Sequence, residues 1–172
     1  MKKSHFREKY HITDTKPVDV IKHRISVVDF VRATETFINE NFYGICEISH
    51  DVSYNTRMIT VAEGHVACFF RELLESVYGK EMIRIKMSLD DELFSVNIEA
   101  DGHLPIDFKD ANRLIRLARS AGFSVTINNT CLRIYTEHSK ALIALRAISF
   151  HTLYGTFYQM FFGPRTEETS TT

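Results

Sequence analysis

Apolar and polar residues alternate along two neighbouring stretches in the middle of the chain, residues 83–89 and 94–98. Alternation at every second position is typical of a strand with one buried face. Asp90-Asp91-Glu92 lies between the two stretches and is typical of a turn, so they predict a β-hairpin. Further strands are predicted at residues 25–28, 45–49, 58–61, 123–127 and 130–136.

Three stretches instead place apolar residues three and four positions apart, which is the period of an amphipathic helix. The clearest covers residues 65–78. A second begins at Asp29, a residue type that caps helices, and is expected to end near Gly44. The third follows Pro105 and ends at Gly122, because glycine readily takes the left-handed conformation that closes a helix.

The C-terminal region is rich in Leu, Ile, Phe and Tyr, and residues 139–162 predict one long helix that is apolar nearly all round. Such a helix needs a partner surface. Arg146, His151 and Gln159 interrupt the apolar run, so we expect a buried or self-associating helix rather than a membrane span. A protein partner or a homodimer formed through this helix is therefore expected.

Composition places the chain among ordinary globular domains. It has 172 residues, of which 44% are apolar and 25% charged, and a formal net charge of −1, so no overall positive field favours nucleic acid. Cys46, Cys68 and Cys131 are odd in number and far apart, which is typical of free thiols in a reducing compartment. No apolar run follows the first lysines, so we expect no signal peptide and a cytoplasmic location.

The order of elements predicts an α+β fold, a two-layer α/β sandwich in which helices cover one face of a mixed, mostly antiparallel sheet. The C-terminal helix is an addition to that core. The expected segments are a polar lead at residues 1–16, the main domain at 17–137, the aromatic helix at 138–163 and a tail at 164–172.

One motif in the clearest helix indicates a family. Glu72 precedes Ser76 by four residues, a spacing that resembles the first motif of the histidine-kinase, gyrase and heat-shock-chaperone (Bergerat-type) ATPases, where the second position is a magnesium-binding Asn. The Asp101-Gly102 loop falls where that family has its adenine-binding box, and residues 112–122 resemble the helix after its ATP lid. The resemblance covers residues 20–137.

The resemblance implies a role for each matching residue. Glu72 takes the place of the catalytic general base, and Ser76, Lys80, Asp101 and Gly102 would surround the nucleotide. An active domain of this family would hold Mg-ATP, and no other metal is implied.

The departures from the family pattern point away from catalysis. Ser76 stands where the family has the Asn whose side-chain amide binds Mg²⁺. The family's second motif has two glycines, and its Asp lies two positions before the first of them. In this chain the loop has a single glycine, Gly102, and Asp101 directly precedes it. Only residues 105–109 separate the loop from the next helix, which leaves few backbone amides to hold a triphosphate.

Other candidate sites receive simpler interpretations. His65 and Cys68 lie three residues apart on a helix, but no second pair completes a zinc site. Cys68 and Cys131 are expected to be apolar core residues rather than nucleophiles. Arg113, Arg116 and Arg119 are expected to form a solvated face, with an anion or acidic partner as the alternative.

The sequence thus leads to a hypothesis with two alternatives. The hypothesis is a non-catalytic signalling module of the histidine-kinase ATPase type that binds protein and needs no cofactor. The first alternative is a functional ATP- or ADP-binding domain, of the histidine-kinase or anti-sigma type, built around Glu72. The second is an unrelated small-molecule-binding domain.

Overall fold

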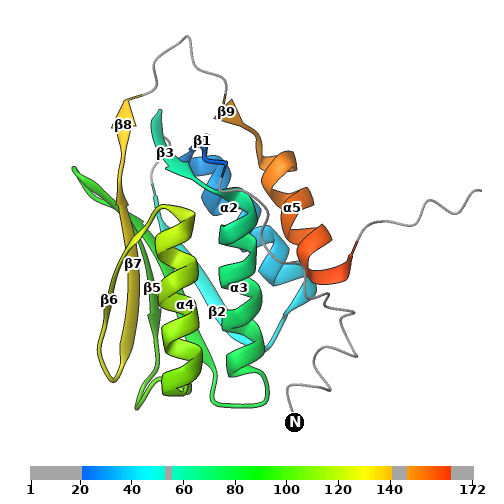
Figure 1. Cartoon of the computed structure of the whole chain (residues 1–172), viewed down its shortest axis with the longest axis vertical. Coiled ribbons are helices and arrows are strands. Elements are labelled where there is room, and N and C mark those ends of the chain that lie inside the picture. The colour runs from blue at the N-terminus through cyan, green and yellow to red at the C-terminus, as the bar shows by residue number, and fades with distance from the viewer. Residues whose placement is uncertain (1–20, 53–55, 141–146, 164–172) are drawn as a thin grey trace, which may run out of the picture.

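The computed structural model describes residues 21–52, 56–140 and 147–163 (Figure 1). Its main sheet has five strands in the order β2-β4-β5-β7-β6, and only β2 and β4 pair in parallel. The predicted α+β class with a mixed, mostly antiparallel sheet is confirmed. The strands are β2 (Cys46–Asp51), β4 (Ile83–Leu89), β5 (Leu93–Glu99), β6 (Ser124–Ile127) and β7 (Cys131–Glu137).

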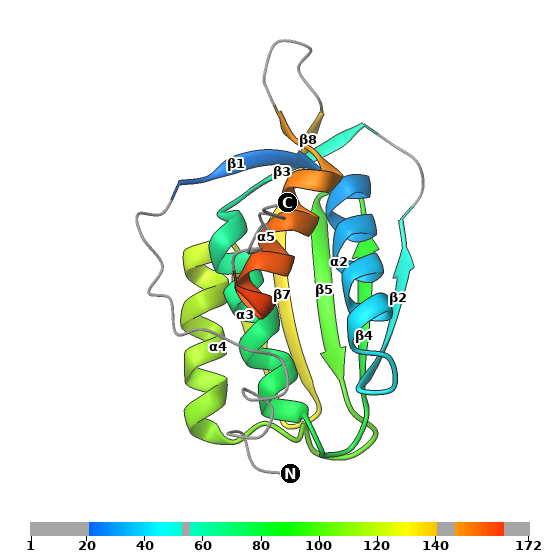
Figure 2. The same ribbon diagram turned by 90° about the vertical axis from the view of Figure 1, so that its right-hand side faces the viewer.

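The described helices cover one face of this sheet. Figures 1 and 2 show α2, α3 and α4 on the sheet, with α5 outermost, over α2 and α3. The opposite face is lined by polar residues that alternate with the core residues of each strand, which is the pattern of an antiparallel sheet with one solvated face. The helices are α2 (Val27–Asn41), α3 (Glu63–Val77), α4 (Phe108–Ala121) and α5 (Phe150–Phe162).

Two helix boundaries follow from specific capping contacts. α2 begins earlier than the predicted Asp29, because the Ser26 hydroxyl accepts a hydrogen bond from the Asp29 N–H at 3.0 Å and so caps the helix upstream of that residue. α4 ends at Gly122 as predicted, with φ of 108°. A Cβ atom there would come within 3.0 Å of the Thr60 carbonyl oxygen, so both conformation and space favour glycine.

A second, smaller sheet corrects the prediction of one long helix over residues 139–162. Residues 139–140 and 147–148 are strands that pair with β3 and β1, and residues 141–146 lie outside the described part. The helix begins only at Phe150, after Ser149 caps it by accepting from the Thr152 N–H. The strands of this sheet are β8 (Ser139–Lys140), β3 (Arg57–Val61), β1 (His23–Ser26) and β9 (Ala147–Ile148).

The prediction failed because a short apolar run does not distinguish a buried strand from a buried helix. No helix in the described ranges is both long enough and apolar enough to cross a membrane.

The apolar side of α5 is part of the core. The Phe37 ring of α2 lies 5.2 Å from the Phe157 ring and 5.0 Å from the Phe161 ring, measured between centroids. Phe70 of α3 meets Phe157 from the other side at 5.7 Å. Phe157 and Phe161 are fully buried, so this aromatic cluster joins the outermost helix to the two beneath it.

Phe157→Ala should therefore lower the free energy of unfolding by about 3–5 kcal/mol, the usual cost of emptying a buried phenylalanine site. Phe108→Ala is the matched control, because that ring is 84% exposed and should change stability by less than about 0.5 kcal/mol. Denaturant titrations of the two variants check this, and equal effects would show that α5 does not close the core.

Candidate functional site

Glu72 lies on α3 where that helix packs against α4. Its side chain is buried, and each of its carboxylate oxygens meets a guanidinium group: Oε1 is 3.2 Å from Nη2 of Arg71, and Oε2 is 3.1 Å from Nη1 of Arg113. The hydrogen bond and the charge of Glu72 raise the pKa of Arg113 above its usual value. The predicted general base thus joins two helices through an ion-pair network.

This arrangement differs from that of a poised base. A general base must reach the proton that it removes. Both oxygens of Glu72 instead accept hydrogen bonds from cations, one from Arg71 of the same helix and one from Arg113 of α4. Arg71 and Arg113 were not predicted as its partners. The sequence placed Arg113 on a solvated face, and its side chain is in fact only partly exposed.

Ser76 lies one turn further along α3 and is also buried. Its hydroxyl donates to the backbone carbonyl oxygen of Glu72 at 2.7 Å. A hydroxyl held by its own helix in this way is a poor oxygen ligand for Mg²⁺, which prefers carboxylates and water.

Lys80 follows α3 and holds the loop that leads to α4. Its Nζ donates to the Pro105 carbonyl oxygen at 3.0 Å. On the other side of the loop, the Leu104 N–H donates to the carbonyl oxygen of Asn129 at 2.7 Å. The loop before α4 is therefore tied to two neighbouring elements.

Asp101 and Gly102 do not join Glu72. The Asp101 carboxylate, whose side chain is 89% exposed, accepts from Nη1 of Arg84 at 2.7 Å. Arg84 lies between the buried Ile83 and Ile85 on β4, so its side chain extends from the sheet face opposite the helices. Gly102 has no left-handed φ, and a Cβ atom added to it would meet no other atom within 4 Å, so neither backbone conformation nor close approach requires glycine there.

The N-terminus of α4 is occupied by the chain's own carboxylates. Asp107 caps the helix, and its Oδ1 accepts from the Asp110 N–H at 2.9 Å. Asp110 adds a second acid in the first turn. The amides and positive dipole end that could bind a phosphate group therefore face negative charge of this chain.

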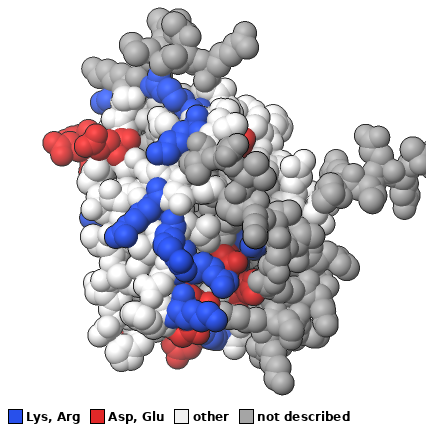
Figure 3. Space-filling view, viewed as in Figure 1, with Lys and Arg blue, Asp and Glu red and all other residues white. Residues whose placement is uncertain are grey.

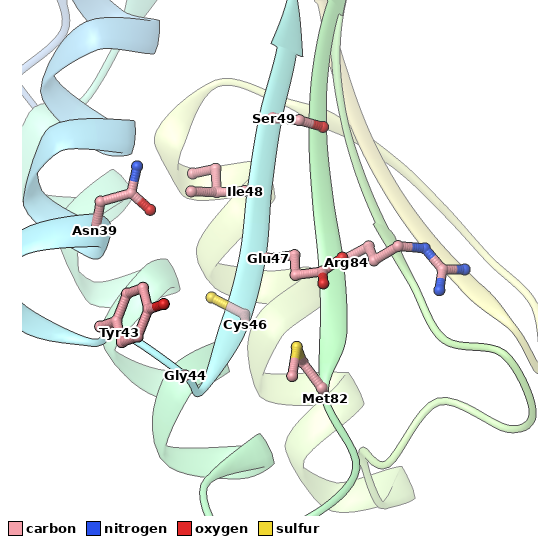
Figure 4. A pocket seen from close by; sticks show the side chains of 9 residues that line it. All are labelled: Asn39, Tyr43, Gly44, Cys46, Glu47, Ile48, Ser49, Met82 and Arg84. Atoms are coloured by element: carbon pink, nitrogen blue, oxygen red, sulfur yellow. The ribbon is translucent and has the colours of Figure 1, made fainter.

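A separate hollow of about 510 Å³ lies between the end of α2 and the start of β2 (Figure 4). Tyr43 and Met82 stand at its rim, and Figure 4 shows Arg84 turned away on the far side of β4. Burial raises the pKa of the Cys46 thiol to about 12, so this thiol is no nucleophile near neutral pH. The hollow contains none of Glu72, Ser76, Lys80 or Asp101.

His65 and Cys68 lie apart from any metal site. Within the described residues, no group of three metal-binding side chains comes together. The Cys68 Sγ lies 3.6 Å from the Sδ of Met160 on α5, and burial raises the pKa of its thiol. Both ring nitrogens of His65 are buried without a hydrogen-bond partner among the described residues, and burial lowers the pKa of the ring.

Comparison with known proteins gives structural likeness without sequence likeness. No family model and no curated protein matches the chain. Similar solved structures include the cytoplasmic segment of histidine kinase QseC, at 11% identity over 80% of this chain and 90% of that chain, with a TM-score of 0.46. Another is the histidine kinase domain of the E. coli osmosensor EnvZ, at 12% identity over 80% and 98%, with a TM-score of 0.40. Both of these proteins are histidine kinases.

Glu72→Ala should destabilise the protein by about 3 kcal/mol, because it leaves the buried Arg71 without that carboxylate. Arg116→Ala, on the exposed side of α4, should change stability by less than about 0.5 kcal/mol. Urea titrations measure both. If Glu72→Ala is as stable as the unchanged protein, the ion pairs of Glu72 do not contribute to the free energy of unfolding, which contradicts the structural role.

His65 should make the fold sensitive to mild acid. Its folded pKa lies below that of the unfolded chain, so the unfolded state binds the proton more readily and stability falls as the pH drops below about 6.5. His65→Gln should reduce this slope, whereas His151→Gln, at an exposed position, should leave it unchanged. Unfolding free energies measured between neutral and mildly acidic pH test the difference, and an unchanged slope in His65→Gln would contradict it.

Proposed function

We propose that the chain is a non-catalytic domain of the histidine-kinase ATPase type that acts by binding another protein. The observation that carries this proposal is the position of Glu72, whose two carboxylate oxygens pair with Arg71 and Arg113 between packed helices. A residue in the place of a catalytic base here serves to hold α3 and α4 together.

The surrounding contacts support the same proposal. Ser76 donates to a helix carbonyl, Lys80 donates to the loop, and Asp107 caps the helix end that would otherwise attract phosphate. Each of these groups, which would lie near the nucleotide, has a partner within the chain. The bonds that a phosphate or a magnesium ion would use are made by the protein itself.

A homodimer through α5 is a second form of the binding role. Leu153, Phe157 and Phe161 face the core, so only the outer side of α5 is available for it. That side carries a shallow hollow of about 220 Å³ lined by His151, Tyr154, Gly155, Tyr158 and Gln159. A light-scattering mass of two chains that returns to one chain in Tyr158→Glu would favour this form.

Millimolar Mg-ATP or Mg-ADP should leave the melting temperature unchanged. A ligand that binds only the folded state at about 100 times its dissociation constant would add about 2.7 kcal/mol of stability, which a thermal scan readily detects. Equilibrium dialysis with labelled ATP provides a second readout that does not depend on stability.

A nucleotide-dependent rise in melting temperature would instead favour the ATP-binding alternative. In that case Lys80→Ala should abolish the rise and Lys86→Ala should retain it, because Lys86 lies on the sheet face opposite the helices. This pair of lysine variants separates binding at the expected site from general association with phosphate.

A further inference from the structure

The outer side of α4 and the adjacent strand β6 form a continuous surface, here called the α4–β6 surface. Positions 108, 111, 115 and 119 follow one another at intervals of three or four and so share one side of α4. Ala111 on this side lines a hollow together with Ile127 of β6. The α4–β6 surface therefore consists of this side of the helix, the neighbouring exposed Arg116 and strand β6.

β6 is an edge strand with an unusual lack of charge. It is the last strand in the sheet order, and Figure 1 shows no described element beyond it. No charged residue occurs from Ser124 to Thr130, whereas the opposite edge strand β2 carries Glu47 and Asp51. Natural sheets commonly protect an exposed edge with charge or proline, and β6 has neither.

The hydrogen-bonding direction of β6 can be read from its turn. The Asn128 N–H donates to the Cys131 carbonyl oxygen at 2.9 Å, toward β7. Alternate residues of an antiparallel edge direct their backbone groups to opposite sides, so those of Val125 and Ile127 point away from the sheet. No strand among the described residues pairs with these groups, so a strand of a partner can use them.

A hollow with both polar and apolar walls lies at one end of β6. Its volume is about 390 Å³, and Leu104, Ile106, Phe108 and Ile127 contribute its apolar walls. Phe108 is 84% exposed and Ile127 is 44% exposed, so large apolar side chains face solvent here. Exposed apolar groups around a hollow are typical of sites that receive an apolar side chain of a partner.

Positive charge lies at the other end. Arg119 follows Phe108 by three turns on the same side of α4, near the point where the chain enters β6. Arg116 and Arg119 are exposed, and neither forms an ion pair with any described residue. Figure 3 shows Lys and Arg side chains in a stripe down this face of the molecule, beside a wide uncharged area.

We infer that the α4–β6 surface binds an extended, acidic segment of a partner protein, which adds a strand to β6. Its apolar residue enters the hollow beside Phe108, and its carboxylates meet Arg119 and Arg116. The four residues of β6 span about 13 Å, so the apolar and acidic residues of the segment should lie about four positions apart. This inference rests on the proposed protein-binding function and names the surface and the chemistry of the partner.

The same cations are a weaker match for nucleic acid. The formal net charge of the chain is −1, and the strand beside the arginines presents no basic side chain. Nucleic-acid surfaces depend on many phosphate contacts, whereas an edge strand supplies backbone hydrogen bonds that only another strand can use in full.

The test is selection of short peptides from a random displayed library on the intact chain. Selected peptides should combine an aliphatic or aromatic residue with Asp or Glu about four positions away. Arg119→Gln should weaken their binding about tenfold, and Lys86→Gln, an equal change of charge on the opposite sheet face, should leave it unchanged. Ile127→Pro should also weaken binding, because it removes an outward N–H and an exposed side chain while sparing the bonds to β7.

Thermal melts of the three variants establish that each is folded. The inference would be overturned if no peptide is selected, or if the selected peptides show no acidic bias. It would also be overturned if Lys86→Gln weakens binding as much as Arg119→Gln, or if a single-stranded oligonucleotide binds more tightly than the peptides. Peptides that bind elsewhere on the chain would overturn the α4–β6 surface and leave the protein-binding role intact. Stabilisation by nucleotide, tested separately, would overturn that role.

Discussion

Helix α3 is buried on every side from His65 to Val77, and most of the structure depends on that constraint. The sheet lies beneath it, α4 lies along one flank and α5 packs over it from the outside. A polar group in such a position must find a partner inside the protein or lose the free energy of its hydration. Glu72 therefore pairs with Arg71 and Arg113, and Ser76 bonds to its own helix.

This constraint also explains why Glu72 serves a structural purpose. Once α4 packs directly on α3, the carboxylate of Glu72 is needed to neutralise arginines at the contact. The short loop before α4 allows this packing, and Lys80 and Asp107 then hold the loop and the helix end.

The distribution of apolar residues points to binding at a sheet edge. The aromatic side of α5 closes the core around Phe37. Most of the apolar surface for which the sequence predicted a partner is therefore buried within the chain. Phe108 and Ile127 remain exposed at β6, whose outer side pairs with no other strand of the described residues. The arginines of α4 differ in the same way: Arg113 pairs with the buried Glu72, whereas Arg116 and Arg119 are exposed.

The sequence alone determined those features that depend on local periodicity. The alternation over residues 83–98 defined the central hairpin, the three-to-four spacing over 65–78 defined α3, and Gly122 marked the end of α4. The α+β class and the mixed sheet followed from the order of these elements. Such patterns are set by neighbours within a few residues, so they can be read from the chain.

Only the tertiary structure decided how distant residues pair. Arg113 reaches Glu72 across forty-one positions of sequence, and no local pattern distinguishes it from the exposed Arg116 on the same helix. Residues 147–148 became a strand because β1 offered them a partner, although their apolar neighbours predicted a helix. Burial and pairing are properties of the packed chain, because the partner that satisfies a charge or a strand edge is supplied by the fold.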